Sequence, residues 1–273
     1  MPEGDTVWLA ARRMHDALAG RQLTRSEFRV PRYATVDFVG RTVLEVVSRG
    51  KHLLTRMDGD LTLHTHFRME GSWRLFRPGQ KWTGGAGHTI RVVLGNGDWT
   101  AVGYRLPVVD LVPTSQEGQV VGHLGPDVLG PDWDPQVALA NLRGRPDEQI
   151  GVALLDQRIL AGLGNIYRCE VCFLCGVSPW TRVRDVPYLE RMVELSHRLL
   201  WVNRDRPEQS TTGDLRRDRS TWVVGRGRRP CRRCGTPIRT VEQGTAPQQR
   251  ITYWCPNCQP LVGDPSREPQ PSG

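Results

Sequence analysis

The stretch CRRC at residues 231–234, followed by CPNC at residues 255–258, decides the fold of the C-terminal part of this chain. Each pair of cysteines can hold one side of a tetrahedral metal ion through two thiolates, and the twenty residues between the pairs can form a ribbon of strands. The spacing predicts a zinc ribbon whose ligands are Cys231, Cys234, Cys255 and Cys258. Four protein ligands leave no open coordination position, so we expect one structural zinc ion, with the chemistry elsewhere.

Positive charge surrounds these cysteines. Arginines crowd the ribbon and its tip, at Arg226, Arg228, Arg229, Arg232, Arg233 and Arg250. The whole chain carries a formal net charge of +8, with an isoelectric point near 9.5. This pattern indicates phosphate binding and a polyanionic partner, with nucleic acid ahead of a membrane surface. A solvated basic surface without a partner is the alternative.

Cysteine usage and apolar content indicate the compartment. No apolar run approaches the roughly eighteen residues that a spanning helix needs, and the start lacks the pattern of a secretory signal. We expect a cytoplasmic protein, nucleoid-associated if bacterial, with no membrane partner. Thiols stay reduced there, so the seven cysteines favour metal binding or core packing over disulfides. Cys169, Cys172 and Cys175 spread over adjoining helix faces, which favours core packing over an iron–sulfur site.

Upstream of the ribbon the pattern is helical. In LDQRILAGLGNIYR (155–168), Gly162 and Gly164 form a tight turn before a helix that begins at Asn165. Such a turn presents backbone N–H groups to an anion, and Asn165 can cap the helix or point its amide at a phosphate. The predicted helices cover residues 135–142, 148–155, 165–175 and 186–202. The polar segment 203–220 shows no period and is expected to be a mobile loop.

The N-terminal part begins with a helix and continues with strands. Apolar spacing predicts a helix over residues 7–19, with Asp5 or Thr6 as its N-cap. Alternating patterns then extend to about residue 105 and include a hairpin through Asn96 and Gly97. The proline- and glycine-rich segment 125–134 is typical of a connector. The sequence thus predicts an α+β protein with an N-terminal β-sandwich flanked by helices.

Several polar residues stand out in this N-terminal part. Removal of Met1 would leave Pro2 with a free secondary amine, a nucleophile placed directly before Glu3. Lys51 follows Gly50 within an apolar strand pair, where it could simply reach water. His64 and His66 share a strand face, together with Arg68 and Glu70, for which a solvated surface and the floor of a DNA groove remain equal alternatives.

Four motifs in the same order resemble the formamidopyrimidine-DNA glycosylase and endonuclease VIII family of base-excision repair enzymes. They are PEG at the N-terminus, RGKHLL in the predicted sheet, LLDQRILAGLGNIYRCE as a helix-two-turns-helix, and RITYWCPNCQ at the end of the ribbon. The resemblance runs from Pro2 to about Gln259. It implies a DNA glycosylase that is also an AP lyase and that binds double-stranded DNA containing damaged bases or abasic sites. We expect a monomer.

The resemblance also implies catalytic roles. Pro2 is similar to the family's nucleophile, whose amine attacks C1′, releases the base and leaves a Schiff base. Glu3 resembles the general acid that opens the sugar ring, and Lys51 matches the lysine that stabilises charge near the lesion. Loss of the 3′ and then the 5′ phosphate would complete β,δ-elimination.

DNA contacts are implied in the same way. Asn165 and Arg250 match residues that grip phosphates around the everted nucleotide, and His66 is similar to a histidine that contacts the DNA backbone. Met69 resembles a methionine that enters the space left by the flipped base, and a core methionine is the equal alternative.

The chain departs from the family pattern at two points. Thr6 stands where many relatives carry a second glutamate, and no Arg-Arg-Phe element follows WTAVGY. PEG and LDQRILAGLGN favour the endonuclease VIII branch, and with it oxidised pyrimidines. Because Thr6 replaces a carboxylate, the rival hypothesis is a relative that binds damaged or abasic DNA without chemistry. Pro2, Glu3 and Lys51 argue against it, since a pure binder needs none of them.

The predicted organisation has five parts. They are a catalytic β-sandwich domain at 1–124, a linker at 125–134, a helical domain at 135–222, a zinc ribbon at 223–260 and a disordered tail at 261–273. We expect the loop at 203–220 to select the lesion.

Overall fold

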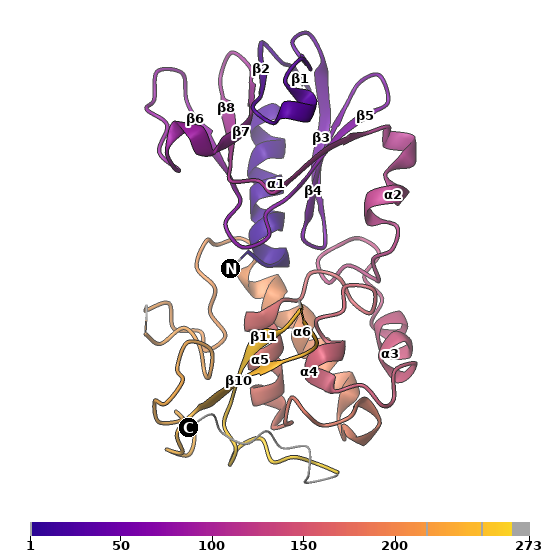
Figure 1. Ribbon diagram of the computed structural model, residues 1–273, viewed down its shortest axis with the longest axis vertical. Helices are drawn as coiled ribbons and strands as arrows, with labels where there is room; N and C mark the ends of the chain where they lie inside the picture. Colours follow the sequence, from indigo (N-terminus) through magenta and orange to yellow (C-terminus); the bar gives the residue numbers. More distant parts are fainter. Residues whose placement is uncertain (1, 217, 247, 264–273) are drawn as a thin grey trace. The chain divides into compact units, whose positions relative to one another are not determined.

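The computed structural model describes residues 2–216, 218–246 and 248–263 (Figure 1). The chain forms two compact units, residues 1–123 and residues 124–273. Residues 264–273, most of the tail predicted to be disordered, lie outside the described residues. Among the described residues, no helix is both long and apolar enough to cross a membrane.

In its described residues, 2–123, the first unit contains one long helix and nine strands. In chain order its elements are α1 (Gly4–Leu18), β1 (Arg21–Gln22), β2 (Arg25–Phe28), η1 (Pro31–Tyr33), β3 (Thr42–Arg49), β4 (His52–Met57), β5 (Leu61–His66), β6 (Ser72–Phe76), η2 (Gly87–Thr89), β7 (Ile90–Gly95), β8 (Thr100–Tyr104), β9 (Val108–Val112), η3 (Thr114–Gln116) and α2 (Gly118–Val121).

These strands form two antiparallel sheets with the orders β1-β3-β4-β5-β9 and β2-β7-β8-β6. Alternate residues of both sheets, such as Leu53 and Leu63 from one and Val92 from the other, join the apolar face of α1 in one core. The predicted sandwich is therefore confirmed. The hairpin at Asn96 is also confirmed, and the side-chain Oδ1 atom of Asn96 accepts the N–H groups of Asp98 and Trp99.

Strand β9 was not predicted, because its five residues show no alternation: all five are half-buried at the sheet edge. It pairs with β5, so that Asp110 lies opposite His64. The face of this sheet that is turned away from the core carries His52, Arg56 and His64.

The second unit is helical and ends in a ribbon. Its elements are α3 (Pro135–Arg143), α4 (Ile150–Ala153), α5 (Asn165–Cys175), η4 (Val183–Asp185), α6 (Leu189–Asn203), β10 (Arg239–Gln243) and β11 (Arg250–Trp254). Strands β10 and β11 pair antiparallel, with Gln243 opposite Arg250. Helix α5 has the predicted bounds and is capped by Gly176, whose φ of 69° is the left-handed conformation that glycine adopts readily.

Two predicted helices are shorter than expected. The helix predicted at 148–155 is a single turn, because Gln149 instead forms a β-bridge with Arg182. The helix predicted from residue 186 begins at Leu189, because Val186 precedes a proline and is extended. Cys169 and Cys172 are fully buried, which confirms that they pack in the core. Burial raises the pKa of the Cys172 thiol far above its usual range.

Candidate active site and nucleic-acid interface

The N-terminal end of α1 carries two buried carboxyl groups. Glu3 is 0% exposed and Asp5 is 1% exposed. Glu3 is the N-cap residue, and its backbone N–H donates to Oγ1 of Thr6 at 3.4 Å. Thr6 was predicted to be a cap but occupies the third helical position, so the helix starts three residues earlier than predicted. Negative charge is favourable at this end of a helix, and the half-buried Pro2 precedes it directly.

Helix α1 runs antiparallel to strand β3. The N–H of Gly20 donates to the carbonyl of Val43 at 2.8 Å, and the N–H of Val46 donates to Nδ1 of His15 at 3.2 Å. From His15 back to the helix start the chain rises about 16 Å, and from Val46 to the end of β3 it rises about 10 Å. Pro2 and Glu3 therefore lie at the end of the sheet where β3 turns into β4, and Figure 1 shows both segments at the same end of the unit.

Lys51 occupies that turn. Arg49 pairs with His52, so Gly50 and Lys51 form a two-residue connection, and Gly50 has a φ of 57°. The left-handed conformation explains the glycine. Lys51 is half-buried at the tip of the hairpin, outside the apolar strand pair in which the sequence suggested it.

His66 lies at the same end, as the last residue of β5 opposite His52. Its Nδ1 atom accepts the N–H of Arg68 at 2.9 Å. Burial, together with the charges of Lys51, His64 and Arg68, lowers the pKa of His66 to about 4. His64 is 4% exposed, so a solvated surface was the wrong interpretation for this residue.

Met69 lies in the tight turn after β5. The N–H of Gly71 donates to the carbonyl of Phe67 at 2.8 Å, and Arg68 has a φ of 46°. The alternation of the strand stops at Phe67, so Met69 is 60% exposed instead of buried beside it. The core-methionine interpretation is therefore wrong, while insertion into DNA stays a prediction.

Asn165 is the first residue of α5, after the N-cap Gly164. Its Nδ2 atom donates to the carbonyl of Ile251 at 2.8 Å, and its Oδ1 atom accepts from Nη2 of Arg168 at 2.5 Å. Arg168 is fully buried and also donates to Oε1 of Gln243 at 2.6 Å. This network fixes the start of α5 to both strands of the ribbon. An amide group has a second N–H, which remains suitable for a phosphate.

Arg250 begins β11, and its side chain is exposed. Its Nη1 atom donates to the carbonyl of Gln249 at 2.7 Å. Arg250 precedes Ile251, whose carbonyl accepts the Asn165 side chain. The second unit thus brings Asn165 and Arg250, its two predicted phosphate-binding residues, close together. The structure places Pro2, Glu3, Lys51, His66 and Met69 in the first unit.

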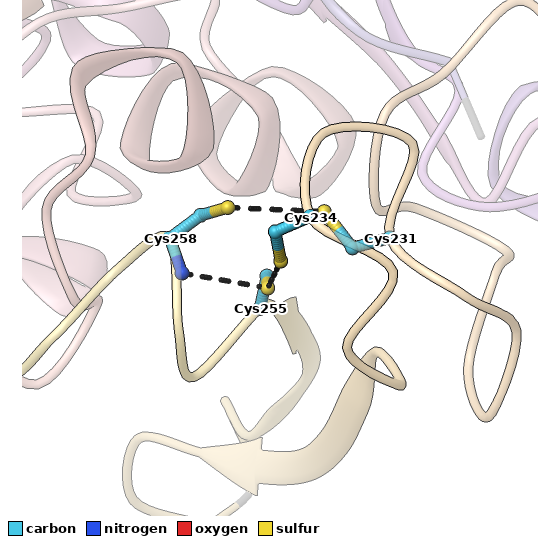
Figure 2. Close-up of side chains that lie close together, drawn as sticks. All are labelled: Cys231, Cys234, Cys255 and Cys258. Carbon is cyan, nitrogen blue, oxygen red and sulfur yellow. Dashed lines mark hydrogen bonds between the residues drawn. The ribbon is translucent and has the colours of Figure 1, made fainter.

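The four predicted zinc ligands converge (Figure 2). Their sulfur atoms all lie within 4.8 Å of one another, with Sγ–Sγ distances of 3.9 Å for Cys231–Cys258 and 3.5 Å for Cys234–Cys255. Tetrahedral zinc with bonds of about 2.3 Å requires sulfurs about 3.8 Å apart, so the site fits this ion. Hydrogen bonds from Thr236 lower the pKa of Cys234 to about 5, whereas burial raises the pKa of Cys255 and of Cys258. A metal cation favours the thiolate form of each of them.

Sequence reasoning missed two charged residues inside α5. Arg168 and Glu170 are both 0% exposed, and the Glu170 carboxylate accepts the N–H groups of Trp222, Val223 and Val224. Burial raises the pKa of Glu170. The sequence held a signal for both residues: two charges in an otherwise apolar helix predict buried charged groups, and a buried charge requires polar partners.

Family models match three successive parts of the chain. They describe the Formamidopyrimidine-DNA glycosylase N-terminal domain (residues 1–104), the Formamidopyrimidine-DNA glycosylase H2TH domain (124–198) and the zinc finger found in FPG and IleRS (229–261). Lactococcus lactis Fpg in complex with an abasic site containing DNA superposes with a TM-score of 0.78 at 22% identity, covering 95% of this chain and 100% of that one. At this identity the likeness shows the fold.

The fold and the four-cysteine site thus define a protein with an Fpg-type sandwich, a helix-two-turns-helix unit and a zinc finger. "Probable endonuclease 8 2" of Streptomyces coelicolor is 61% identical, covering 95% of this chain and 94% of the relative. "DNA-(apurinic or apyrimidinic site) lyase Nei2" of Mycolicibacterium smegmatis is 47% identical, covering 95% of this chain and 99% of that relative. The chain belongs to the formamidopyrimidine-DNA glycosylase and endonuclease 8 family. The names of these relatives agree with the predicted enzyme class, DNA glycosylase with AP lyase activity.

Proposed function

We propose that the protein is a bifunctional DNA glycosylase and AP lyase that uses Pro2 as its nucleophile. The observation that carries the proposal is the antiparallel packing of α1 on β3. It sets Pro2 and Glu3 at the same end of the sheet as Lys51 and His66. An amine, an acid and two phosphate-binding groups are what the reaction requires.

On this proposal, Pro2 and Glu3 carry the first bond changes of the reaction. The unprotonated amine of Pro2 attacks C1′ of the damaged nucleotide, the bond to the base breaks, and the base leaves with the electron pair and gains a proton. The nitrogen then loses its N–H proton, Glu3 protonates the ring oxygen, and the nitrogen lone pair opens the sugar to form an iminium. A proton is then lost from C2′, the 3′ phosphate leaves, and a second elimination releases the 5′ phosphate.

The N-terminal position of the nucleophile suits this chemistry. A terminal amine has a lower pKa than a lysine, so a larger fraction is unprotonated at neutral pH. The iminium of a secondary amine carries no N–H, so it cannot lose a proton to become a neutral imine and it stays positively charged. The mechanism requires that Met1 be absent.

The second unit supplies DNA binding on this proposal. Asn165 and Arg250 bind phosphates near the lesion, and the first unit adds His66 and inserts Met69 where the base has left the stack. One zinc ion held by the four cysteines stabilises the ribbon and takes no part in the chemistry.

Oxidised pyrimidines are the proposed substrates. Support comes from the endonuclease VIII-like motifs and from relatives named endonuclease 8, including one of Escherichia coli at 33% identity, which covers 95% of this chain and 100% of that relative. We assign lesion selection to the loop at 203–220. Exchange of this loop for that of a relative with another base preference should change the preferred base, and an unchanged preference would refute the assignment.

Borohydride trapping on a duplex with an abasic site tests the mechanism. We expect a covalent adduct from protein whose intact mass shows that Met1 is absent, and little adduct from Pro2→Gly. The control is Lys81→Ala, an exposed lysine remote in sequence from Lys51. It should form the adduct like wild type.

A non-catalytic binder is the second candidate, and one observation favours it. At the position of the relatives' glutamate, Thr6 accepts the Glu3 N–H and brings no carboxylate. If zinc-replete protein lacking Met1 binds abasic DNA but gives no adduct, and excises no oxidised base from duplex, bubble or single-stranded DNA, the binder replaces the enzyme.

A further inference from the structure

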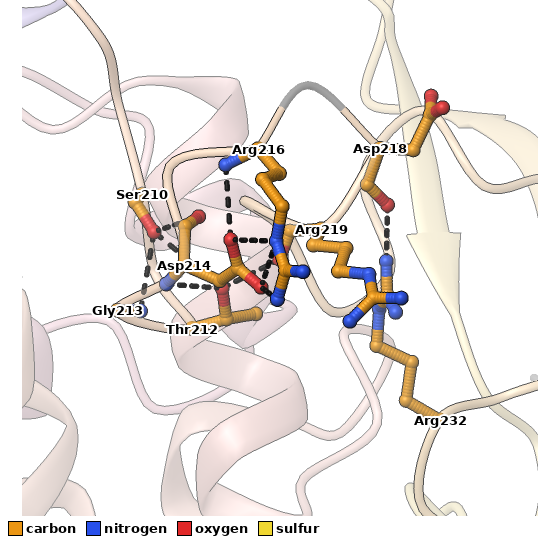
Figure 3. A network of polar contacts seen from close by, with 8 residues as sticks. All are labelled: Ser210, Thr212, Gly213, Asp214, Arg216, Asp218, Arg219 and Arg232. Atoms are coloured by element: carbon orange, nitrogen blue, oxygen red, sulfur yellow. Dashed lines mark hydrogen bonds and ion pairs between the residues drawn. The ribbon is translucent and has the colours of Figure 1, made fainter.

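The segment from residue 210 to residue 220, here called the lobe, closes on itself through its described residues 210–216 and 218–220. At its base the N–H of Thr211 donates to the carbonyl of Ser220 at 2.8 Å. Farther out, Oγ1 of Thr212 donates to the carbonyl of Arg219 at 2.6 Å, and Oγ of Ser210 donates to the carbonyl of Asp214 at 3.0 Å (Figure 3). These contacts all join residues of the lobe, so they define its shape. Its orientation relative to the rest of the second unit depends on contacts with other segments.

The first anchor of the lobe is the buried Glu170 of α5. Its carboxylate accepts the Thr211 hydroxyl at the base of the lobe and the N–H groups of residues 222–224, which follow it. The indole N–H of Trp222 donates to the carbonyl of Thr211 at 3.3 Å, and its ring stacks on Phe173 at 5.7 Å. The exit of the lobe is thereby tied to the helix.

The second anchor comes from the zinc site. Arg232 lies between the ligands Cys231 and Cys234, and its Nη2 atom donates to the carbonyl of Asp218 within the lobe. Its Nε atom donates to the carbonyl of Thr221 at 3.2 Å. Figure 3 shows the guanidinium of Arg232, which lies outside the lobe in sequence, directed at Asp218. One planar fork thus holds two carbonyls through two different nitrogens, a spacing that the single nitrogen of a lysine does not reproduce.

Arg233, the next residue, strengthens the same connection. Its guanidinium carbon lies 4.5 Å from the centre of the Phe173 ring and 5.9 Å from the centre of the Trp222 ring. A cation over these stacked rings favours their arrangement. Both arginines of CRRC therefore face the neighbouring segment, although the sequence suggested phosphate binding for them.

We propose that Arg232 and Arg233 are positioning residues that couple the four-cysteine site to the lobe. The conformation that the metal imposes on residues 231–234 fixes where the two guanidinium groups lie, and these fix the lobe. The proposal rests on the proposed function in one respect: because the lobe is assigned to lesion selection, the zinc site influences base excision and leaves cleavage at an existing abasic site unchanged.

Hydrogen exchange measured by mass spectrometry on the full-length, zinc-loaded protein reads this coupling directly. The reporters are the amides of Thr211, Trp222, Val223 and Val224, all hydrogen-bonded in the structure. In Arg232→Ala we expect their exchange to be roughly tenfold faster, the effect of losing bonds from a charged donor. Arg198→Ala, which removes an exposed arginine from α6, should exchange like wild type.

Arg232→Lys separates positioning from phosphate binding. Lysine keeps the charge but loses the fork, so we expect this variant to exchange like Arg232→Ala. Wild-type exchange in either variant would overturn the proposal. A fall in bound zinc that accompanies faster exchange would also overturn it, because the arginine would then act on the metal site itself. Metal content is measured on each preparation.

Measurements of base excision and of abasic-site trapping test the proposal independently of hydrogen exchange. In Arg232→Lys, excision of an oxidised pyrimidine from a duplex should fall roughly tenfold, while borohydride trapping on an abasic site stays at the wild-type level. An equal loss of both activities would overturn the assignment to lesion selection. Wild-type protein inactive on both substrates would refute the proposed function, and the exchange arm would still decide the coupling.

Discussion

The Nδ1 atom of His52 lies 2.8 Å from the Nε2 atom of His64, and the two rings stack with their centres 5.1 Å apart. Such a contact requires an N–H on one ring and a lone pair on the other, so it is lost when both rings are protonated. The rings of His66 and His123 lie 4.7 Å and 6.2 Å from that of His52. Four imidazoles thus share one region beside Lys51, and burial lowers the pKa of three of them, His52, His64 and His66.

Stability should therefore fall in mild acid. Burial, together with the neighbouring histidines and Lys51, lowers the pKa of His52 to about 3. In the unfolded chain histidine binds a proton near pH 6.5, so below that pH the unfolded state binds more protons and the free energy of unfolding decreases. Between pH 7 and pH 5 we expect His52 to account for about 1 kcal/mol after allowance for solvent screening.

Urea unfolding at both pH values measures this effect. His52→Gln should lose less stability than wild type on going from pH 7 to pH 5, and His88→Gln, at an exposed position, should lose as much as wild type. An identical pH dependence in His52→Gln and wild type would show that the cluster does not titrate as described.

Met69 and Met57 should respond in opposite ways to truncation. Met69 is 60% exposed, so Met69→Ala should change the free energy of unfolding by less than about 0.5 kcal/mol. It should nevertheless slow excision of a base from duplex DNA, because nothing fills the gap in the stack. Met57 is 1% exposed in the core, and Met57→Ala should cost about 2–5 kcal/mol. Unfolding curves and single-turnover excision separate the two, and full excision by Met69→Ala would remove it from the interface.

Thr6 can be tested by two replacements. Thr6→Val removes the acceptor for the Glu3 N–H and should destabilise the protein by about 1 kcal/mol. Thr6→Glu restores an acceptor at the third helical position and adds the carboxylate found in relatives. We expect it to be as stable as wild type and to excise oxidised pyrimidines roughly tenfold faster. Equal excision rates for wild type and Thr6→Glu would mean that the lack of a carboxylate at residue 6 does not limit excision.

Removal of the metal should affect the ribbon selectively. Cys255 is fully buried, and Cys255→Ser should abolish zinc binding and lower the affinity for DNA, since Arg250 lies on the strand that ends before it. Cys175→Ala is the matched control: this thiol is half-buried at the end of α5 and does not belong to the four-cysteine cluster. Zinc content and salt-dependent DNA binding report the result. Retention of a full equivalent of zinc by Cys255→Ser would contradict the four-cysteine site.

Local patterns predicted much of the fold because they reflect local physics. The spacing of Cys231, Cys234, Cys255 and Cys258 fixed the ribbon, and the glycine turn fixed the start of α5 at Asn165. Errors arose where a distant segment decided the outcome. Residue 149 leaves its helix because Arg182 offers a bridge, and the half-buried edge strand β9 had no alternation to reveal it.

The candidate site shows the same division. Residue types and order singled out Pro2, Glu3 and Lys51, but their shared location depends on α1 packing against β3, a contact between segments distant in sequence. The exposure of Met69 depends on the turn at Arg68, which breaks the strand period. Arg232 was predicted to bind phosphate because sequence shows charge and does not show the carbonyls within reach.

The two-residue turn at Gly50 and Lys51 restricts which insertions this hairpin can accept. Side chains alternate between the faces of a strand, so one added residue there would send His52 toward the core and Leu53 toward the polar face. Single-residue length changes in this turn should therefore be rare across species. They should accumulate instead in the exposed connection at 77–81, where no such alternation has to be preserved.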